Sequence, residues 1–517
     1  MMSGNGESVT AVRGRVAARP VPIPAMPDPI RADLLPPSAT CEQARLSRDP
    51  RFDGVFFTAV RTTGIYCRPV CPAPPPKAAN VEYFANAASA EAAGYRPCLR
   101  CRPELSPAEG SWRRGDDLVA RATRLIEDGF LDEAPVAALA GRLHVGERHL
   151  RRLFGAQLGT GPKQVHATRR LLFAKQLLTE TRLPVTDVAL ASGFGSLRRF
   201  NAAFRGAYGL APSRIRQCDE LHAAPGPLVL RLAYRPPFDF RATLAFLQPR
   251  ALPGIERVDD AGYARLIDAR GAWLQLSEWG DDEAALRLVL YGVAADALPR
   301  IVRRVRRMFD LDADPRAIHA CLGRDPELAR SLARQPGLRL PGGWDGFEVA
   351  VRAVLGQQVS VAAATTLTRR LLARFGEEAT TPASSDLHVL FPAPAVLAEA
   401  DLADIGLTGS RIATLRAVAR AVADGRAGFA GDLPLEAFIA QWTALPGIGD
   451  WTAHYVAMRA LGHPDAFPAG DLVLRKQAGA GSALSERTLR QHAEDWRPWR
   501  AYAAIHLWHA ASTETTP

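Results

Sequence analysis

Four closely spaced cysteines lie between positions 67 and 101 and leave little freedom for the fold around them. Their pattern is Cys67-x3-Cys71 followed by Cys98-x2-Cys101. Two close pairs joined by a short subdomain can bring four thiolates to one point, as tetrahedral zinc requires. The other three cysteines of the 517 residues are scattered, so the clustering favours a metal site over disulfides. A domain this small has little core, and we expect the metal to supply much of its stability.

The length of the chain requires several domains, because 517 residues exceed a single core and predict about three or four. Residues 1–37 are rich in Pro and Gly and predict a disordered leader. They contain no apolar core of the length of a signal peptide, and no later stretch is apolar enough to span a bilayer. We therefore expect a cytoplasmic protein of multidomain α+β class with no membrane partner.

The positive charge is concentrated in one part of the chain. Residues 1–227 hold 31 Lys and Arg against 21 Asp and Glu, whereas residues 228–517 hold 33 of each kind. Within residues 142–216 there are 14 basic and 3 acidic residues. A basic block this narrow indicates a nucleic-acid surface, although a solvated helical face would have the same composition.

The sequence around the cysteines, residues 48–104 with the phrase TTGIYCRP, closely resembles the N-terminal domain of the Ada adaptive-response regulators. The resemblance predicts a zinc and methyl-acceptor domain over residues 38–108, with Zn²⁺ held by Cys67, Cys71, Cys98 and Cys101. It also implies that Cys67 is the nucleophile that takes a methyl group from a methyl phosphotriester in DNA. A purely structural zinc site is the alternative.

Two helical pairs follow in residues 135–216. PVAALAGRLHVGERHLRRLF spaces its apolar residues three, four or seven apart, which predicts two helices joined near His144 to Gly146. After a helix in ATRRLLFAKQLLTE, a second pair begins at Val185 with a turn at Gly193 to Gly195. With the phrase GLAPSRIR, this arrangement resembles the AraC family and predicts an all-α double helix-turn-helix over residues 112–217.

The second helix of each pair carries long hydrogen-bond donors, which can read base edges in the major groove. Any one of these residues could instead contact phosphate or only solvent. The candidates are Arg148, His149 and Arg152 in the first unit, and Ser196, Arg198, Arg199 and Asn201 in the second.

The C-terminal half begins after an expected linker over residues 218–227. Strand-like alternation follows from Leu228 and predicts an α+β subdomain over residues 228–312, and the chain is mainly helical beyond Pro341. The phrase LPGIGDWTA, residues 445–453, has the helix-hairpin-helix pattern. Gly447 and Gly449 permit a tight turn there, and the next helix offers free N–H groups to a DNA phosphate.

Residues 228–511 most resemble the AlkA type of 3-methyladenine DNA glycosylase, with LGQQVS and RPWRAYAAIHLW among the matching phrases. The helix-hairpin-helix glycosylase domain is expected over residues 313–512. Asp471 stands 22 residues after Gly449, the spacing of the catalytic acid in these glycosylases. A carboxylate can stabilise the oxocarbenium charge of glycosidic cleavage, although an Asp here is also a common helix N-cap.

The resemblance also implies the base pocket and its chemistry. Trp451 stands where lyase members of the superfamily carry a lysine, which predicts a monofunctional, hydrolytic enzyme. Trp451, Tyr455 and Trp508 match the pocket aromatics, on which a cationic alkylated purine would stack once flipped out of the duplex, although each could instead be a core residue. Gln358 takes the position of the residue that wedges into the duplex.

We interpret the chain as a fusion of methylation sensor, transcriptional activator and repair glycosylase. Its expected partners are alkylated DNA, promoter DNA and RNA polymerase, and it is expected to be a monomer. Two alternatives are a regulator whose glycosylase-like half only binds DNA, and a repair enzyme whose front half only tethers it to DNA.

Overall fold

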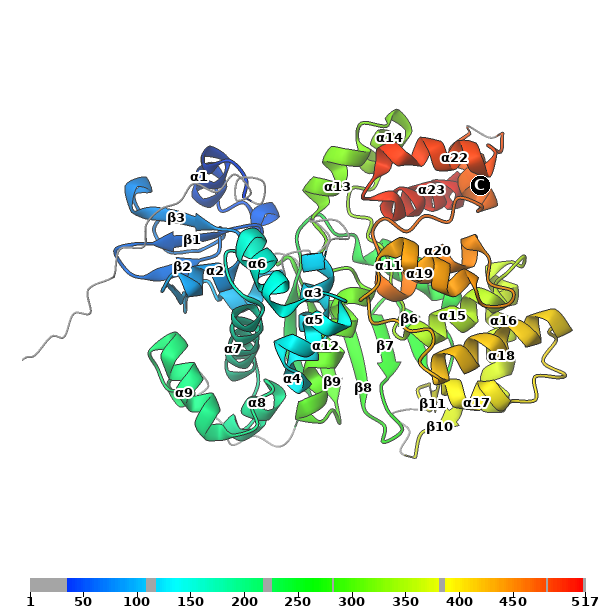
Figure 1. The fold of residues 1–517 in the computed structure, drawn as a ribbon, viewed down its shortest axis with the longest axis horizontal. Coiled ribbons are helices and arrows are strands. Elements are labelled where there is room, and N and C mark those ends of the chain that lie inside the picture. Colours follow the sequence, from blue (N-terminus) through cyan, green and yellow to red (C-terminus); the bar gives the residue numbers. More distant parts are fainter. Residues whose placement is uncertain are drawn as a thin grey trace, which may run out of the picture.

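The computed structural model describes residues 35–107, 118–216, 226–280, 283–380, 386–479 and 482–514. Most of the expected leader and linker lies outside these residues. Figure 1 shows a cysteine-rich domain at one end, a large helical domain at the other, and an antiparallel sheet with further helices between them. No helix in the described part of the chain combines the length and the apolar character needed to cross a membrane.

The cysteine-rich domain is built on a four-stranded sheet of order β3-β1-β2-β4. Strand β1 is antiparallel to β2 and β3, and β2 is parallel to β4. The elements are α1 (Ser38–Leu46), η2 (Pro50–Phe52), β1 (Phe57–Val60), β2 (Ile65–Cys67), η3 (Ala78–Asn80), β3 (Val81–Phe84), α2 (Ala87–Ala92), β4 (Arg96–Pro97) and η4 (Pro103–Leu105). Two small apolar clusters, around Tyr66 and around Phe56, form its core.

Residues 118–216 form eight helices, in the predicted double helix-turn-helix order: α3 (Leu118–Glu127), α4 (Phe130–Glu133), α5 (Val136–Arg142), α6 (Glu147–Leu158), α7 (Pro162–Glu180), α8 (Val185–Ala191), α9 (Leu197–Tyr208) and α10 (Pro212–Ile215). The pairs α5/α6 and α8/α9 form where the apolar periodicity predicts them. Helix α7 begins at Pro162, five residues earlier than ATRRLL suggests, because proline is well tolerated at the first helical position.

The α+β subdomain is a five-stranded antiparallel sheet of order β5-β9-β8-β7-β6. Its elements are β5 (Leu228–Ala233), α11 (Phe240–Leu247), η6 (Gln248–Arg250), β6 (Glu256–Asp259), β7 (Gly262–Leu266), β8 (Trp273–Glu278), β9 (Ala285–Tyr291), η7 (Ala295–Ala297) and α12 (Leu298–Met308). Within the alternating stretch of residues 228–254, only β5 forms a strand. Residues 240–247 are helical because Asp239 caps α11 through Ala242 N–H, at 2.7 Å, and the apolar residues there recur at helical spacing.

The helical domain holds α13 (Pro315–Leu322), α14 (Pro326–Arg334), α15 (Gly346–Leu355), α16 (Val361–Phe375), α17 (Pro394–Glu399), α18 (Gly409–Ala423), α19 (Leu435–Thr443), α20 (Asp450–Leu461), α21 (Leu472–Gln477), α22 (Glu486–His492), η8 (Ala493–Trp496) and α23 (Arg500–Glu514), with a short ladder of β10 (Glu377–Glu378) and β11 (Val389–Leu390). Many of these helices begin at an Asp, Ser or Thr whose side chain accepts a first-turn N–H. These caps are Asp314, Asp325, Asp345, Ser360, Thr408, Asp471 and Ser485.

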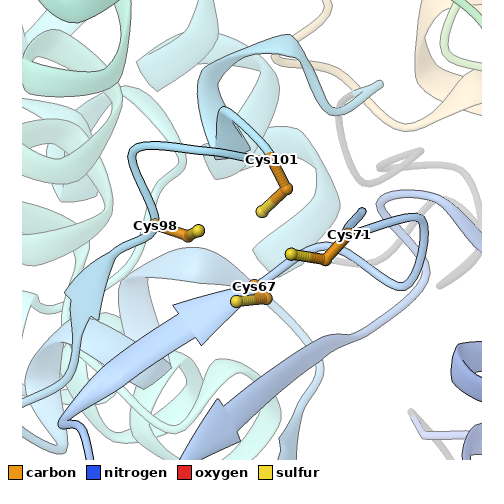
Figure 2. A group of neighbouring side chains, drawn as sticks. All are labelled: Cys67, Cys71, Cys98 and Cys101. Atoms are coloured by element: carbon orange, nitrogen blue, oxygen red, sulfur yellow. The ribbon is translucent and has the colours of Figure 1, made fainter. Parts of the chain in front are cut away.

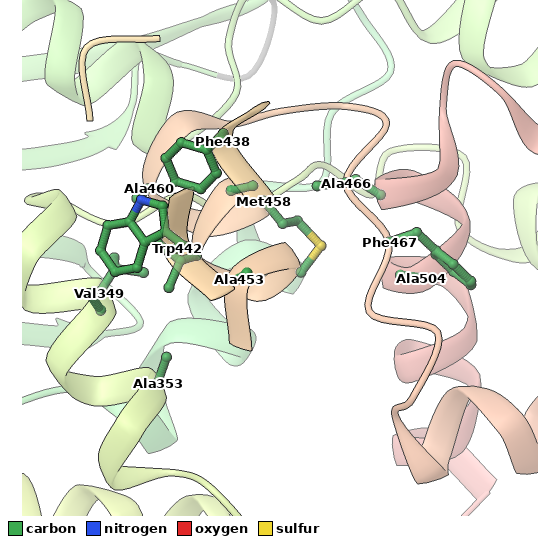
Figure 3. Close-up of a cluster of buried hydrophobic side chains, with 14 of the residues drawn as sticks. Val349, Ala353, Phe438, Trp442, Ala453, Met458, Ala460, Ala466, Phe467 and Ala504 are labelled. Carbon is green, nitrogen blue, oxygen red and sulfur yellow. The ribbon is translucent and has the colours of Figure 1, made fainter. Parts of the chain in front are cut away.

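Two large cores hold the chain together. One fills the helical domain; Figure 3 shows the part of it around Trp442, which is fully buried against Phe438. The other core is shared: Phe200 and Phe204 of the second helix-turn-helix unit belong to the same cluster as Leu230 and Leu288 of the sheet. The second helix-turn-helix unit and the α+β subdomain therefore share one core, whereas α3, α5 and α6 pack around a smaller core of their own.

Candidate metal centre and aromatic acidic site

The four clustered cysteines converge on one point (Figure 2). Their sulfur atoms all lie within 4.8 Å of one another. Cys67 ends β2, and the N–H of Cys98 donates to the carbonyl of Tyr66 at 2.9 Å, which brings the second pair beside the first. Cys98 and Cys101 are buried, whereas Cys67 and Cys71 are half-buried. Four soft sulfur donors at this separation fit a tetrahedral zinc ion.

Hydrogen bonds within and around the cluster influence the protonation of its four thiols. Backbone N–H groups donate to two sulfurs, from Arg68 to Cys101 Sγ at 3.3 Å and from Arg100 to Cys98 Sγ at 3.4 Å. Hydrogen bonding with Cys101 lowers the pKa of Cys71 to about 7 and holds the pKa of Cys98 far below its usual range, whereas hydrogen bonding among the same four thiols raises the pKa of Cys67 and Cys101. Deprotonated sulfur at neutral pH is what metal binding requires.

We expect removal of the metal to loosen the whole cysteine-rich domain, because its apolar clusters are small. Cys41 can report this change. It is fully buried, and burial raises the pKa of its thiol to about 11. After chelation, maleimide labelling followed by peptide mass spectrometry should detect modification of Cys41 at least about tenfold faster than in the metal-loaded protein. Labelling of Cys321, which lies outside the domain, should not change, and a Cys41 that stays inert would contradict the expectation.

The predicted base-reading residues lie on two solvent-facing helix surfaces. Arg148, His149 and Arg152 are exposed on α6, and Arg152 Nη2 lies 3.2 Å from His149 Nδ1. On α9, Arg198 and Arg199 are exposed, and Asn201 is half-buried. Ser196 also has a local role, because its hydroxyl accepts Arg199 N–H at 3.3 Å and caps α9.

Asp471 stands at the start of α21 and does two things at once. Its Oδ1 atom caps the helix, accepting from Val473 N–H at 2.9 Å and Leu474 N–H at 3.1 Å. The indole N–H of Trp508 also donates to Oδ1, at 3.2 Å, and that of Trp451 donates to Oδ2, at 3.1 Å. The structure confirms that Asp471 is an N-cap, and it also places the carboxylate within hydrogen-bond distance of two indole N–H groups.

The three predicted pocket aromatics form one group beside this carboxylate. Trp451 stacks on Tyr455, with ring centroids 5.2 Å apart and an interplanar angle of 14°. Tyr455 and Trp508 lie 6.4 Å apart and are tilted by 59°. All three side chains are half-buried. The arrangement offers electron-rich ring faces next to a negative charge, which suits a flat cationic ligand.

Two residues of this site escaped the sequence interpretation. Arg459 Nη1 donates to the Tyr455 hydroxyl at 2.9 Å. Burial acts to raise the pKa of Tyr455, but the guanidinium groups of Arg459 and its neighbours outweigh burial and lower that pKa. Gln357 donates to Gly447 O at 3.0 Å and to Thr452 Oγ1 at 3.1 Å. The four-residue spacing of Tyr455 and Arg459 could have indicated their contact.

The hairpin between α19 and α20 has the predicted glycine chemistry. Gly447 has φ +77°, and a Cβ there would lie 1.9 Å from Thr414 Oγ1, so no other residue fits. Gly449 precedes α20, and a Cβ there would meet no atom within 4 Å. The space beside Gly449, at the start of α20, is therefore open. Gln358, beside this hairpin, is exposed and has φ +57°.

Comparison with known families follows the same order along the chain. Residues 40–104 match the metal binding domain of Ada, and residues 139–217 match a helix-turn-helix domain. Residues 229–345 match the AlkA N-terminal domain, and residues 351–498 match the HhH-GPD superfamily of base excision DNA repair proteins. With the tetrathiolate centre, these matches define a zinc-binding, DNA-binding protein that carries a DNA glycosylase domain.

Similar whole proteins combine the same parts. The chain is 40% identical over 481 residues to the "probable bifunctional transcriptional activator/DNA repair enzyme AlkA" of Mycobacterium tuberculosis, covering 90% of this chain and 95% of that protein. The chain therefore belongs to this family of bifunctional transcriptional activator/DNA repair enzymes. It is also 34% identical to DNA-3-methyladenine glycosylase 2 of Escherichia coli, over 54% of this chain and 96% of that protein. Identity to the Escherichia coli enzyme Ada is 46%, over 29% of this chain and 41% of Ada.

Proposed function

We propose that the chain detects DNA methylation at Cys67, activates transcription through its helix-turn-helix units, and excises alkylated purines such as 3-methyladenine at Asp471. The observation that carries the repair part is the carboxylate of Asp471 held by two indole N–H groups beside a stacked Trp and Tyr. The domains assigned to these activities are residues 38–108, 112–217, 228–312 and 313–512.

Excision is proposed to proceed by hydrolysis. A cationic alkylated purine, flipped out of the duplex, stacks on the rings of Trp451, Tyr455 and Trp508. As the glycosidic bond breaks, its electron pair leaves with the purine, and the Asp471 carboxylate stabilises the positive charge on the sugar. Water then adds to the sugar cation, releases one proton to solvent, and leaves an abasic site. The hairpin at Gly447 and Gly449 binds a phosphate of the DNA backbone. Gln358 fills the space that the flipped base leaves in the duplex.

Methyl transfer is proposed to occur once per chain. The Cys67 sulfur bonds to the methyl carbon while the methyl C–O bond of the phosphotriester breaks, leaving a phosphodiester anion in DNA and a thioether on the protein. Zinc held by Cys67, Cys71, Cys98 and Cys101 would keep the sulfurs as thiolates, and methylation of Cys67 would remove one negative charge from the set. The loss of one negative charge weakens repulsion of DNA phosphates and favours promoter binding.

The release of 3-methyladenine tests the repair activity. Purified protein is incubated with duplex DNA treated with dimethyl sulfate, and free bases are measured by chromatography. Release of 3-methyladenine supports the proposal. A folded protein that binds this DNA and releases no base would instead be a regulator with a DNA-binding second half.

Footprinting separates an activator from a tether. An activator requires tighter protection of a promoter after Cys67 is methylated, whereas a tether predicts protection that does not depend on methylation. The proposed promoter contacts are Arg148, His149, Arg152, Ser196, Arg198, Arg199 and Asn201.

We also propose that the protein acts in the cytoplasm as a monomer and contacts RNA polymerase, as its resemblance to Ada and AraC-type activators suggests.

We expect no covalent intermediate with DNA during excision. Trp451 occupies the position two residues after Gly449 where a lysine would form a Schiff base, and its indole is engaged with Asp471. Borohydride added during turnover should therefore trap no protein–DNA adduct, and the product should be an intact abasic site. An adduct mapped to Lys476, the only lysine on α21, would contradict a purely hydrolytic enzyme.

A further inference from the structure

Helix α7, which bridges the two helix-turn-helix units, is also the surface on which the zinc domain rests. Thr168 Oγ1 donates to Glu91 Oε2. Lys175 Nζ donates to Cys98 O at 3.1 Å and to Glu104 Oε2 at 2.7 Å. Arg102 Nη2 donates to Thr179 Oγ1 at 2.7 Å. The helix residues 168, 175 and 179 are spaced seven and four apart, which places them on one helix face.

These contacts reach both halves of the ligand set. Glu91 also accepts from the Tyr66 hydroxyl, at 3.0 Å, and Tyr66 directly precedes Cys67. Cys98 is itself a zinc ligand, and Glu104 lies three residues after the ligand Cys101. The position of the ligand loop, residues 98–104, is therefore tied to α7 by direct hydrogen bonds.

A neighbouring face of α7 contacts the repair half, and Glu180 on it also accepts from Arg102 of the zinc domain, at 3.1 Å. Gln176 Nε2 donates to Arg231 O at 3.0 Å, and Glu180 Oε2 accepts Arg231 N–H at 3.2 Å. Leu171 and Leu177 belong to the core that includes β5 and β9. Helix α7 is thus packed between the zinc domain and the sheet of the α+β subdomain (Figure 1).

The ion pair between Lys175 and Glu104 is buried from solvent. Lys175 is 1% exposed, and the Glu104 side chain is 0% exposed. A buried ammonium or carboxylate that loses its partner is strongly disfavoured, so the two groups move together or the interface opens. The carbonyl of Cys98 is held by the same ammonium, which links any movement of the ligand loop to the helix.

We propose that α7 couples the state of the zinc centre to the packing of both other parts of the protein. A change in the ligand loop shifts Cys98 O and Glu104, Lys175 follows, and α7 loosens from the β5 side of the sheet. The regulator and repair halves then respond to the chemical state of the centre through one helix. This coupling is independent of whether Cys67 accepts methyl groups or Asp471 excises bases.

Amide hydrogen exchange on the full-length, zinc-loaded protein tests the coupling. In the wild type, removal of zinc by a chelator should speed exchange in residues 98–105 and, about tenfold or more, in α7 and β5. The test variant replaces both buried charges, Lys175→Met with Glu104→Gln, and Arg102, which also contacts Glu104, keeps its ion pair with Glu180. Zinc content is measured in each sample. The variant should still bind one zinc per chain, while exchange in α7 no longer responds to zinc removal.

Lys163→Met is the matched control, because Lys163 is an exposed lysine on the same helix. It should respond to zinc removal like the wild type. If the double variant does not fold, Thr168→Val removes the Glu91 contact with little change in shape and should reduce the α7 response. The proposal is overturned if α7 and β5 exchange in the wild type ignores zinc removal, or if the folded variant that removes the contact responds as the wild type does.

Discussion

Asp471→Asn should lower the rate of 3-methyladenine release by about 10²-fold to 10³-fold, because the transition state loses the negative charge beside the sugar. The fold should survive. Asparagine is as good an N-cap as aspartate, so its carbonyl oxygen can keep the contacts to Val473 and Leu474 N–H. In the wild type, the Trp451 indole N–H donates to Asp471 Oδ2. In the variant this N–H would face the amide NH₂ group, which cannot accept it, so the tryptophan fluorescence should change. Base release and fluorescence are measured on the same preparation.

A second aspartate provides the matched control for Asp471. Asp345 caps α15 in the same way, accepting from Phe347 N–H at 2.9 Å and Glu348 N–H at 3.2 Å. Asp345→Asn should leave base release within about twofold of the wild type, because it changes a cap without changing the pocket. If Asp471→Asn released bases at the wild-type rate, the residue would be only a cap, and another group would have to stabilise the sugar cation.

Cys67→Ala should abolish methyl transfer from phosphotriester-containing DNA, because it removes the sulfur nucleophile that is proposed to accept the methyl group. The reaction occurs once per chain, so the expected loss is complete and is measured as labelled methyl per protein after incubation with methylated DNA. Base release should persist, since Asp471 belongs to a separate domain. Zinc content is determined in parallel, because the variant retains three of the four ligands.

Cys321→Ala is the control for this substitution. Cys321 is a half-buried cysteine of the helical domain, away from the zinc ligands. The control should accept one methyl group per chain like the wild type. Continued methylation of the Cys67→Ala protein, mapped by mass spectrometry to Cys71, Cys98 or Cys101, would move the acceptor role to that cysteine.

Much of the local structure could be predicted from the sequence. The apolar spacing in residues 135–216 predicted the helix pairs, and the structure begins them at Val136, Glu147, Val185 and Leu197. Local signals were misleading where a cap or a proline outweighed the pattern. Asp239 begins a helix inside a stretch that alternates like a strand, and Pro162 begins α7 before its apolar repeat is evident.

The sequence by itself determined the chemistry that spacing can encode: four thiols for one metal ion, glycines for a hairpin, and an acid at the start of a helix. These features depend on neighbours within a few residues or on a motif, so they can be read along the chain. The tertiary structure alone decided which distant groups meet. It brings the indole N–H groups of Trp451 and Trp508 to the two carboxylate oxygens of Asp471. It also joins the second helix-turn-helix unit to the sheet in one core, and it buries Lys175 against the ligand loop, residues 98–104. These contacts join residues that are tens of positions apart in the sequence. Their contribution to the free energy of folding depends on burial and on partners that no local pattern specifies.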